Sequence, residues 1–123
     1  MKTIDTEKAP AAIGPYSQAK VSGGFVFTSG QIPADPMSGE IVGADVTAQA
    51  EQVMANLGAV LAAAGSDFSR VVKATCFLAS MDDFAAFNAV YGKYMTGKPA
   101  RSCVAVKTLP KNVLCEVEAI AEV

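Results

Sequence analysis

The apolar residues of this chain recur with two different periods, and the order of these periods limits the fold more than any other feature. Residues 47–64 carry apolar side chains at helical intervals, with Asp45 or Thr47 as the candidate N-cap. Residues 84–94 repeat that spacing after Ser80, which is also a candidate N-cap. The two segments are predicted to be helices.

Shorter segments have the composition and spacing of β-strands. Residues 19–21 and 24–29 predict a hairpin, residues 70–79 predict a third strand, and residues 99–123 predict two strands joined by the tight turn LPKN. The order hairpin, helix, strand, helix, strand, strand predicts an α+β fold, with a mixed β-sheet and two helices packed on one face. With 123 residues, about half of them apolar, the chain is expected to form one domain, residues 1–123.

The charge balance disfavours several classes of partner. Ten Lys and Arg residues stand against twelve Asp and Glu, giving a net charge of −2 and a pI near 5.0. An acidic chain without a basic stripe is not expected to bind nucleic acid. No segment approaches the roughly 18 to 20 continuous apolar residues of a membrane span. Cys76, Cys103 and Cys115 form no CxxC pair. These features predict a cytoplasmic protein with reduced thiols and no membrane association.

Histidine is absent, which removes Ser-His and Cys-His couples and most zinc sites. Any catalysis must use carboxylate, guanidinium, phenol, thiol, hydroxyl, ammonium or backbone groups. Neither a metal nor another cofactor is expected.

The last two predicted strands place charged residues among small apolar ones. If the LPKN turn holds an even number of loop residues, Ala105 lies opposite Glu116, and Arg101, Cys103 and Glu116 then share the face without helices. An odd loop would undo this register. Two interpretations remain open: the charges solvate an exposed sheet face, or this face is a subunit interface that encloses a few polar groups.

Several segments carry a resemblance to a known family. They are KAPAAIGPYSQA, FTSGQIP, DVTAQAEQVMANL, and above all PARSCVAV followed by LCEVEAIA. Together they run nearly the length of the chain, and the sequence resembles the YjgF/Rid family of reactive intermediate deaminases, specifically its imine-deaminase branch. The resemblance implies a homotrimer, like bacterial chorismate mutase, with the helix-free sheet faces packed together and pockets between subunits. The activity it implies is hydrolysis of 2-iminobutanoate and 2-iminopropanoate to 2-oxo acids and ammonia.

The resemblance also assigns catalytic roles. Arg101 would grip the substrate carboxylate through its guanidinium fork, and Glu116 would orient or deprotonate the attacking water. Cys103 would act mainly through its main chain near the imine nitrogen, with a thiol role as the alternative.

The remaining candidates are expected to bind the substrate. Tyr16 would close the site from a neighbouring chain, and Ser29 with Gly30 would supply hydroxyl and backbone contacts. Asn88 aligns with a pocket residue of the family, although a solvent-facing role on its helix is also open.

Two other functions stay open. A non-catalytic trimer that senses carboxylates or acts as a chaperone would use the same pocket. An endoribonuclease or translation inhibitor would have to bind RNA with an acidic chain.

Overall fold

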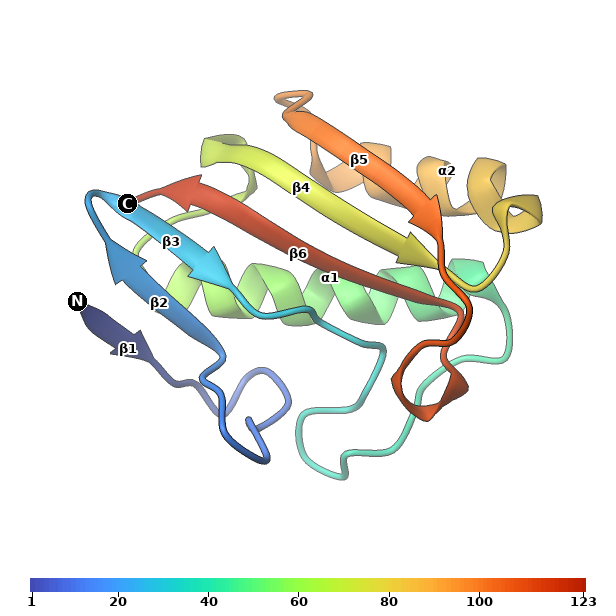
Figure 1. Cartoon of the computed structure of the whole chain (residues 1–123), viewed down its shortest axis with the longest axis horizontal. Helices are drawn as coiled ribbons and strands as arrows, with labels where there is room; N and C mark the ends of the chain where they lie inside the picture. The colour runs from blue at the N-terminus through green and yellow to red at the C-terminus, as the bar shows by residue number, and fades with distance from the viewer.

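The protein, described over residues 1–123 by a computed structural model, has a six-stranded sheet with two helices on one face (Figure 1). The strands are β1 (Lys2–Ile4), β2 (Ala19–Ser22), β3 (Phe25–Thr28), β4 (Val71–Leu78), β5 (Ala100–Ala105) and β6 (Cys115–Glu122). The helices are α1 (Val46–Ala63) and α2 (Phe84–Tyr94), and the connections contain the short turns η1 (Phe68–Arg70), η2 (Met81–Asp83) and η3 (Pro110–Asn112). The predicted α+β class and mixed sheet are confirmed.

The strands run in the order β1-β2-β3-β6-β4-β5, and all neighbours are antiparallel except β4 and β5. The predicted hairpin of residues 19–29 is present as β2 and β3. The predicted terminal hairpin is wrong, because β4 lies between β5 and β6 and pairs with both. The chain passes from β4 through α2 to β5, and such a strand–helix–strand crossover joins parallel strands.

This topology also corrects the predicted register. Ala105 pairs with Leu78 rather than with Glu116. Paired residues point to the same face, and Leu78 is fully buried beneath the helices. Every second residue of a strand points to the same face, so Arg101 and Cys103 lie with Ala105 on the helix side. Glu116 lies between two residues that are buried under the helices, so it points to the opposite face. The prediction that Arg101, Cys103 and Glu116 share the helix-free face is therefore wrong.

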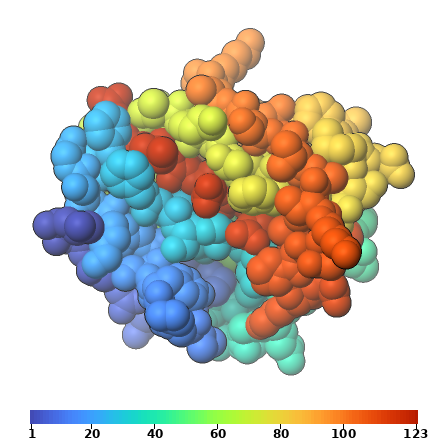
Figure 2. Space-filling model, in the orientation of Figure 1, coloured from blue at the N-terminus to red at the C-terminus, as the bar shows by residue number.

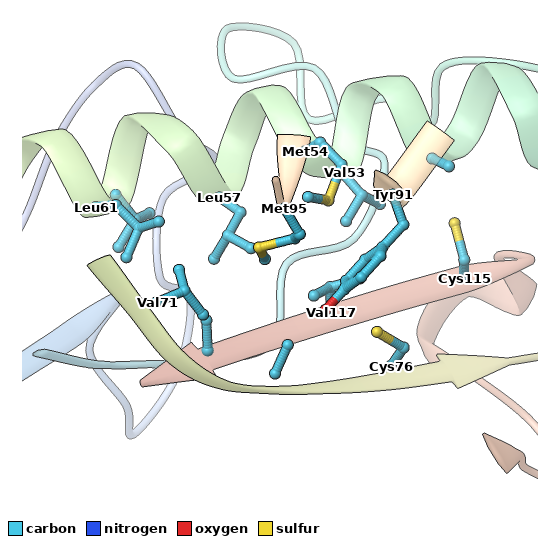
Figure 3. Close-up of a cluster of buried hydrophobic side chains, with 14 of the residues drawn as sticks. Val53, Met54, Leu57, Leu61, Val71, Cys76, Tyr91, Met95, Cys115 and Val117 are labelled. Atoms are coloured by element: carbon cyan, nitrogen blue, oxygen red, sulfur yellow. The ribbon is translucent and has the colours of Figure 1, made fainter. Parts of the chain in front are cut away.

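The core lies between the sheet and the two helices (Figure 3). Cys76 and Cys115 are fully buried free thiols in it. Each large apolar side chain removed from water stabilises the fold by roughly 1.5–3 kcal/mol. The fully buried apolar residues of α1 are Ala50, Val53, Met54, Leu57, Val60 and Leu61.

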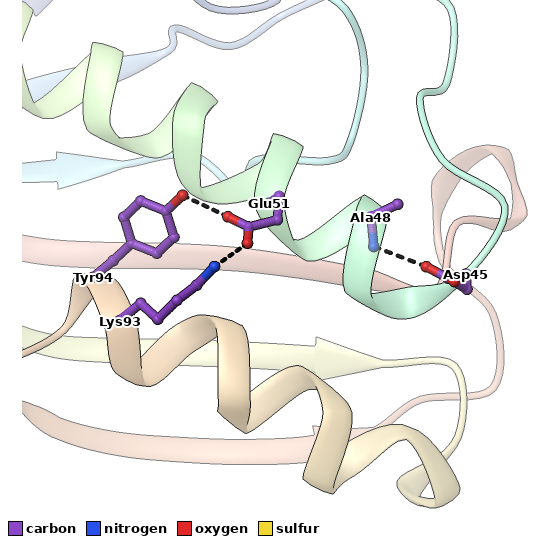
Figure 4. Close-up of polar contacts among 5 residues, drawn as sticks. All are labelled: Asp45, Ala48, Glu51, Lys93 and Tyr94. Atoms are coloured by element: carbon purple, nitrogen blue, oxygen red, sulfur yellow. Dashed lines mark hydrogen bonds and ion pairs between the residues drawn. The ribbon is translucent and has the colours of Figure 1, made fainter.

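Polar side chains fix where the helices begin. Asp45 is the N-cap of α1, because its Oδ1 accepts a hydrogen bond from the backbone N of Ala48 at 2.9 Å (Figure 4). The alternative N-cap, Thr47, lies inside the helix. Ser80 caps the turn η2, which leads into α2, by accepting a hydrogen bond from Asp82 N at 3.1 Å.

A polar contact joins the two helices. Lys93 of α2 forms an ion pair with Glu51 of α1, and the Tyr94 hydroxyl donates to Glu51 Oε1 at 2.5 Å (Figure 4). The contact links α2 to α1 above the sheet. The length and apolar content of these helices fall short of a membrane span.

The opposite face of the sheet carries no helix, and side chains of β3 to β6 are visible across it in Figure 2. Cys103 and Ala105, which the predicted register placed on this face, lie on the helix side. The apolar members include Phe27, Phe77, Val104 and Ile120, and the charged members include Lys73, Glu116 and Glu118. Phe27 and Val104 are 44% and 45% exposed, which is high for side chains of their size.

Candidate functional site

The seven predicted site residues fall into two groups. The glutamate group consists of Tyr16, Ser29, Gly30 and Glu116, which together line one cavity of about 420 Å³. The arginine group consists of Asn88, Arg101 and Cys103, which lie around α2 and the edge strand β5. Because Arg101 and Glu116 point to opposite faces of the sheet, one chain does not bring the two groups together.

The glutamate group forms where the segment after β3 continues along β6. Gln31 N donates to Val117 O at 2.8 Å and Val117 N donates to Gln31 O at 3.1 Å, which places Gly30 beside Glu116. A Cβ on residue 30 would lie 1.8 Å from Glu116 Oε2. Glycine is therefore required for the carboxylate to occupy this position.

Tyr16 is held near Glu116 through its own loop. Ser29 N donates to Gln18 O at 2.9 Å, and Ser29 Oγ donates to Ser17 O at 2.6 Å. Tyr16 is 54% exposed, so much of its side chain is open to solvent. Its side chain lines the cavity together with Glu116, so a molecule bound there can contact it.

Glu116 is a half-buried carboxylate that accepts no hydrogen bond within its own chain. Burial raises the pKa of this carboxyl above its usual range, and repulsion from the nearby Glu118 raises the pKa further. A carboxylate of raised pKa without a partner is suited to accepting a proton.

The arginine group is held by neutral side chains. Arg101 Nη1 donates to Asn88 Oδ1 at 2.6 Å, so Asn88 lies at the site rather than facing solvent alone. The guanidinium carbon is 4.7 Å from the centre of the Tyr91 ring and 5.5 Å from that of Phe84. The one ion pair of the chain joins Lys93 to Glu51, so no carboxylate of the chain neutralises Arg101. A cavity of about 600 Å³ beside it is open to an anionic ligand.

Cys103 lies on β5 next to Arg101 and pairs in register with Cys76 of β4. Burial raises the pKa of the Cys103 thiol, although the Arg101 charge acts in the opposite direction. A thiol in this environment is protonated near neutral pH and is a weak nucleophile.

Three buried polar residues that support the site were not among the predicted residues. The Gln18 amide accepts from Thr6 N and donates to Thr6 O and Pro10 O, which fixes the loop that carries Tyr16. Asn56 of α1 donates to Ile32 O and Ala34 O. Gln49 of α1 accepts from Leu114 N and donates to Gly43 O. Asn56 and Gln49 could have been recognised from the sequence, because each is a polar residue within the apolar stripe of a helix.

No set of three or more Cys, Asp or Glu side chains is arranged to hold a metal ion. The two groups present a guanidinium, a carboxylate, a phenol, a thiol and neutral hydrogen-bonding groups.

Comparison with known proteins agrees over nearly the whole chain. Residues 6–123 match the family model described as endoribonuclease L-PSP. A Lactococcus lactis protein named as the regulator AldR is 56% identical over 124 residues, covering 100% of this chain and 98% of that protein. The 2-iminobutanoate/2-iminopropanoate deaminase of Escherichia coli is 52% identical, covering 98% of this chain and 96% of that protein.

Solved structures agree with the fold. The crystal structure of Escherichia coli TdcF with bound serine has a TM-score of 0.94 and 46% identity, covering 100% of this chain and 99% of that one. The YjgF gene product of Escherichia coli has a TM-score of 0.94 and 49% identity, covering 99% and 98% of the two chains. The chain therefore belongs to the YjgF/Rid family.

Proposed function

We propose that this protein is a homotrimeric deaminase that hydrolyses 2-iminobutanoate and 2-iminopropanoate to 2-oxo acids and ammonia. The observation that carries the proposal is the Arg101 guanidinium, which is held by neutral groups beside an open cavity and pairs with no carboxylate of its chain. The deaminase name of a relative at 52% identity supports the same reaction.

Arg101 binds the carboxylate of the imino acid. A planar guanidinium forms two parallel hydrogen bonds to a carboxylate, and a single lysine ammonium does not reproduce them. Asn88 accepts from Nη1 and fixes the orientation of the fork.

Glu116 activates the water. Its carboxylate takes one proton from water as the oxygen attacks the imine carbon, the C=N electron pair moves to the nitrogen, and the nitrogen receives that proton to give a tetrahedral carbinolamine. The carbinolamine hydroxyl then gives up its proton and forms the C=O bond of the 2-oxo acid, while the C–N bond breaks and the nitrogen takes up that proton and leaves as ammonia. The raised pKa of Glu116 makes it a stronger base than an exposed glutamate. Each step uses only water and protons, so no cofactor is needed.

Cys103 acts through its main chain near the imine nitrogen. The raised pKa of its thiol opposes a covalent role. Tyr16 closes the pocket, and Ser29 with Gly30 supplies a hydroxyl and a backbone N–H at its wall.

The complete site lies between subunits. The glutamate group of one chain meets the arginine group of its neighbour, because the sheet separates the two groups within a chain. The helix-free face, with its exposed Phe27 and Val104, packs against the other subunits of the trimer. The free thiols are consistent with a cytoplasmic location.

A non-catalytic carboxylate sensor is the second candidate, and the regulator name of a relative at 56% identity favours it. The sensor would use Arg101 in the same way and bind 2-oxo or 2-imino acids without turnover. Nucleolytic activity is disfavoured by the net charge of −2.

A coupled assay tests the proposal. A pyridoxal-phosphate dehydratase generates 2-aminocrotonate or 2-aminoacrylate, and the loss of the imine is followed with and without the protein. Because imines also hydrolyse in water, a blank that lacks only the protein is required. Wild-type protein is expected to accelerate the loss. Arg101→Ala should weaken substrate capture by roughly 2–5 kcal/mol, and Arg101→Lys should restore only part of it.

The control is binding of 2-oxobutanoate, measured by calorimetry. Binding without acceleration in the wild type would favour the sensor. Full activity of the Arg101→Ala variant would show that another residue binds the carboxylate.

A further inference from the structure

Arg101 rests on the faces of two aromatic rings. The ring of Tyr91 is the closer one, with its centre 4.7 Å from the guanidinium carbon, and that of Phe84 is 5.5 Å away. Both distances lie within the range of a cation–π contact. Both residues belong to α2.

The position of Tyr91 is set by the core rather than by Arg101. The side chain is 8% exposed and packs against the Phe87 ring at 5.8 Å between centres. Figure 3 shows it extending from α2 toward β6, near Val117 and Cys76. Phe84 is only partly buried at the first turn of α2. Tyr91 is therefore the more rigid of the two supports.

The hydroxyl group does not explain why a tyrosine occupies position 91. It is buried and has no hydrogen-bond partner among the groups of the protein. Burial raises the pKa of this phenol to about 12, so it is neutral and cannot pair with Arg101 as a phenolate. The face of the ring is the part of Tyr91 that meets the guanidinium.

An aromatic support has an advantage over an acidic one at this position. A carboxylate would hold Arg101 more firmly, but it would neutralise the charge and compete with an anionic ligand. The negative face of a ring attracts the guanidinium without occupying its N–H donors. Apart from the Nη1 donor that binds Asn88, these donors remain free for the substrate.

We propose that Tyr91 is a positioning residue for Arg101: its buried ring holds the guanidinium plane through a cation–π contact and keeps the hydrogen-bonding edge toward the ligand carboxylate. The inference rests on the proposed function, in which Arg101 binds that carboxylate. Tyr91 itself does not touch the reacting atoms.

The test varies the charge of the ring face without changing its shape. Position 91 is occupied by Tyr, by Phe, and by phenylalanines that carry one, two and three ring fluorines, which withdraw charge from the face stepwise. The Kd for 2-oxobutanoate is measured by calorimetry, and KM and kcat are measured in the imine assay. Tyr91→Phe should bind within twofold of wild type and melt at the same or a higher temperature, because an unpartnered hydroxyl is removed. Each added fluorine should raise Kd and KM, while kcat stays nearly constant.

Tyr91→Leu and Tyr91→Met remove the ring, and we expect them to raise Kd by about 3- to 30-fold, the equivalent of one cation–π contact. The matched control is Tyr94→Leu, which removes a ring of the same helix that packs on Phe68 and does not contact Arg101. Its Kd should equal that of wild type.

The outcomes are distinct. A wild-type protein that does not bind 2-oxobutanoate would overturn the proposed function and this inference together. If wild type binds and Kd does not depend on the number of fluorines, only the inference is wrong. Weak binding by Tyr91→Phe would also overturn it, because the hydroxyl would then be the active group.

Discussion

The two charged residues of the candidate site lack partners of opposite charge within their own chain. Arg101 is supported by an amide and two rings, and Glu116 accepts no hydrogen bond. A half-buried charge that has no partner destabilises the fold, so such a position is more readily explained by function than by stability. Lys93 and Glu51 show the contrast, since these two side chains neutralise one another.

The raised pKa of Glu116 predicts the behaviour of a Glu116→Gln variant. If the carboxylate accepts the proton of water, this change should lower turnover by about 10²- to 10⁴-fold and leave binding of 2-oxobutanoate intact. In the wild type, kcat/KM should rise with pH as the carboxyl ionises, with the rise displaced above the pH at which an exposed glutamate ionises. A pH–rate profile of each protein, corrected for the blank, measures both effects.

Stability gives an independent check on the same residue. A carboxyl whose pKa is higher in the folded state than in the unfolded state binds its proton more tightly when folded, so stability decreases as pH rises between the two pKa values. Glu116→Gln removes that loss, and its melting temperature should exceed that of wild type at neutral pH and approach it in acid. Equal imine turnover by wild type and Glu116→Gln would contradict the catalytic role of Glu116. If only Cys103→Ala loses turnover, the thiol is the catalytic group.

Among the secondary-structure elements, α1 supports the site at a distance. Its fully buried Asn56 donates to Ile32 O at 3.0 Å and to Ala34 O at 2.9 Å, and Ile32 lines the cavity of the glutamate group. The segment that positions Gly30 against Glu116 is therefore fixed to the helix by a single amide.

Asn56→Ala is expected to lower the free energy of unfolding by about 2 kcal/mol, because two loop carbonyls lose their donor. Denaturant titration at a fixed protein concentration measures this change. The control is Gln52→Ala, which removes the hydrogen bond from Gln52 Nε2 to Asn56 Oδ1 but leaves both loop carbonyls bonded, and it should cost less than Asn56→Ala. Equal losses in the two variants would show that the loop does not depend on Asn56.

Both helices and five of the six strands were predicted, but the short strand β1 (Lys2–Ile4) and one strand pairing were not. The periodicity and the caps placed both helices and the first hairpin to within a few residues. The LPKN turn, however, suggested a hairpin, because a short polar turn between two strands has the same composition whether or not the strands pair. The succession of strand 71–78, helix 84–94 and strand 100–105 is a strand–helix–strand unit, and it would have predicted the parallel pairing of β4 and β5.

At the scale of the whole molecule, the sequence named candidate site residues but did not predict their division between the two faces of the sheet. Alternation shows which residues of a strand share a face, but it does not say which face the helices cover. Arg101 and Cys103 reach the helix side because β5 follows the register of β4, and this depends on contacts far apart in sequence. A single chain therefore carries the glutamate group and the arginine group on opposite faces of its sheet. The exposed Phe27 and Val104 lie on the face through which copies can meet.

Mixing two inactive variants tests whether the site is shared. Arg101→Ala retains Glu116, and Glu116→Gln retains Arg101, so each alone should have little activity as a trimer of about three times 12.7 kDa. If the variants are denatured together in equal amounts and refolded, the chains assort at random into trimers. A site that takes Arg101 from one chain and Glu116 from its neighbour is then intact in about a quarter of cases, so about a quarter of wild-type activity should return. A mixture of separately refolded variants is the control and should stay inactive. Light scattering that finds a stable monomer, or a refolded mixture without activity, would contradict the shared site.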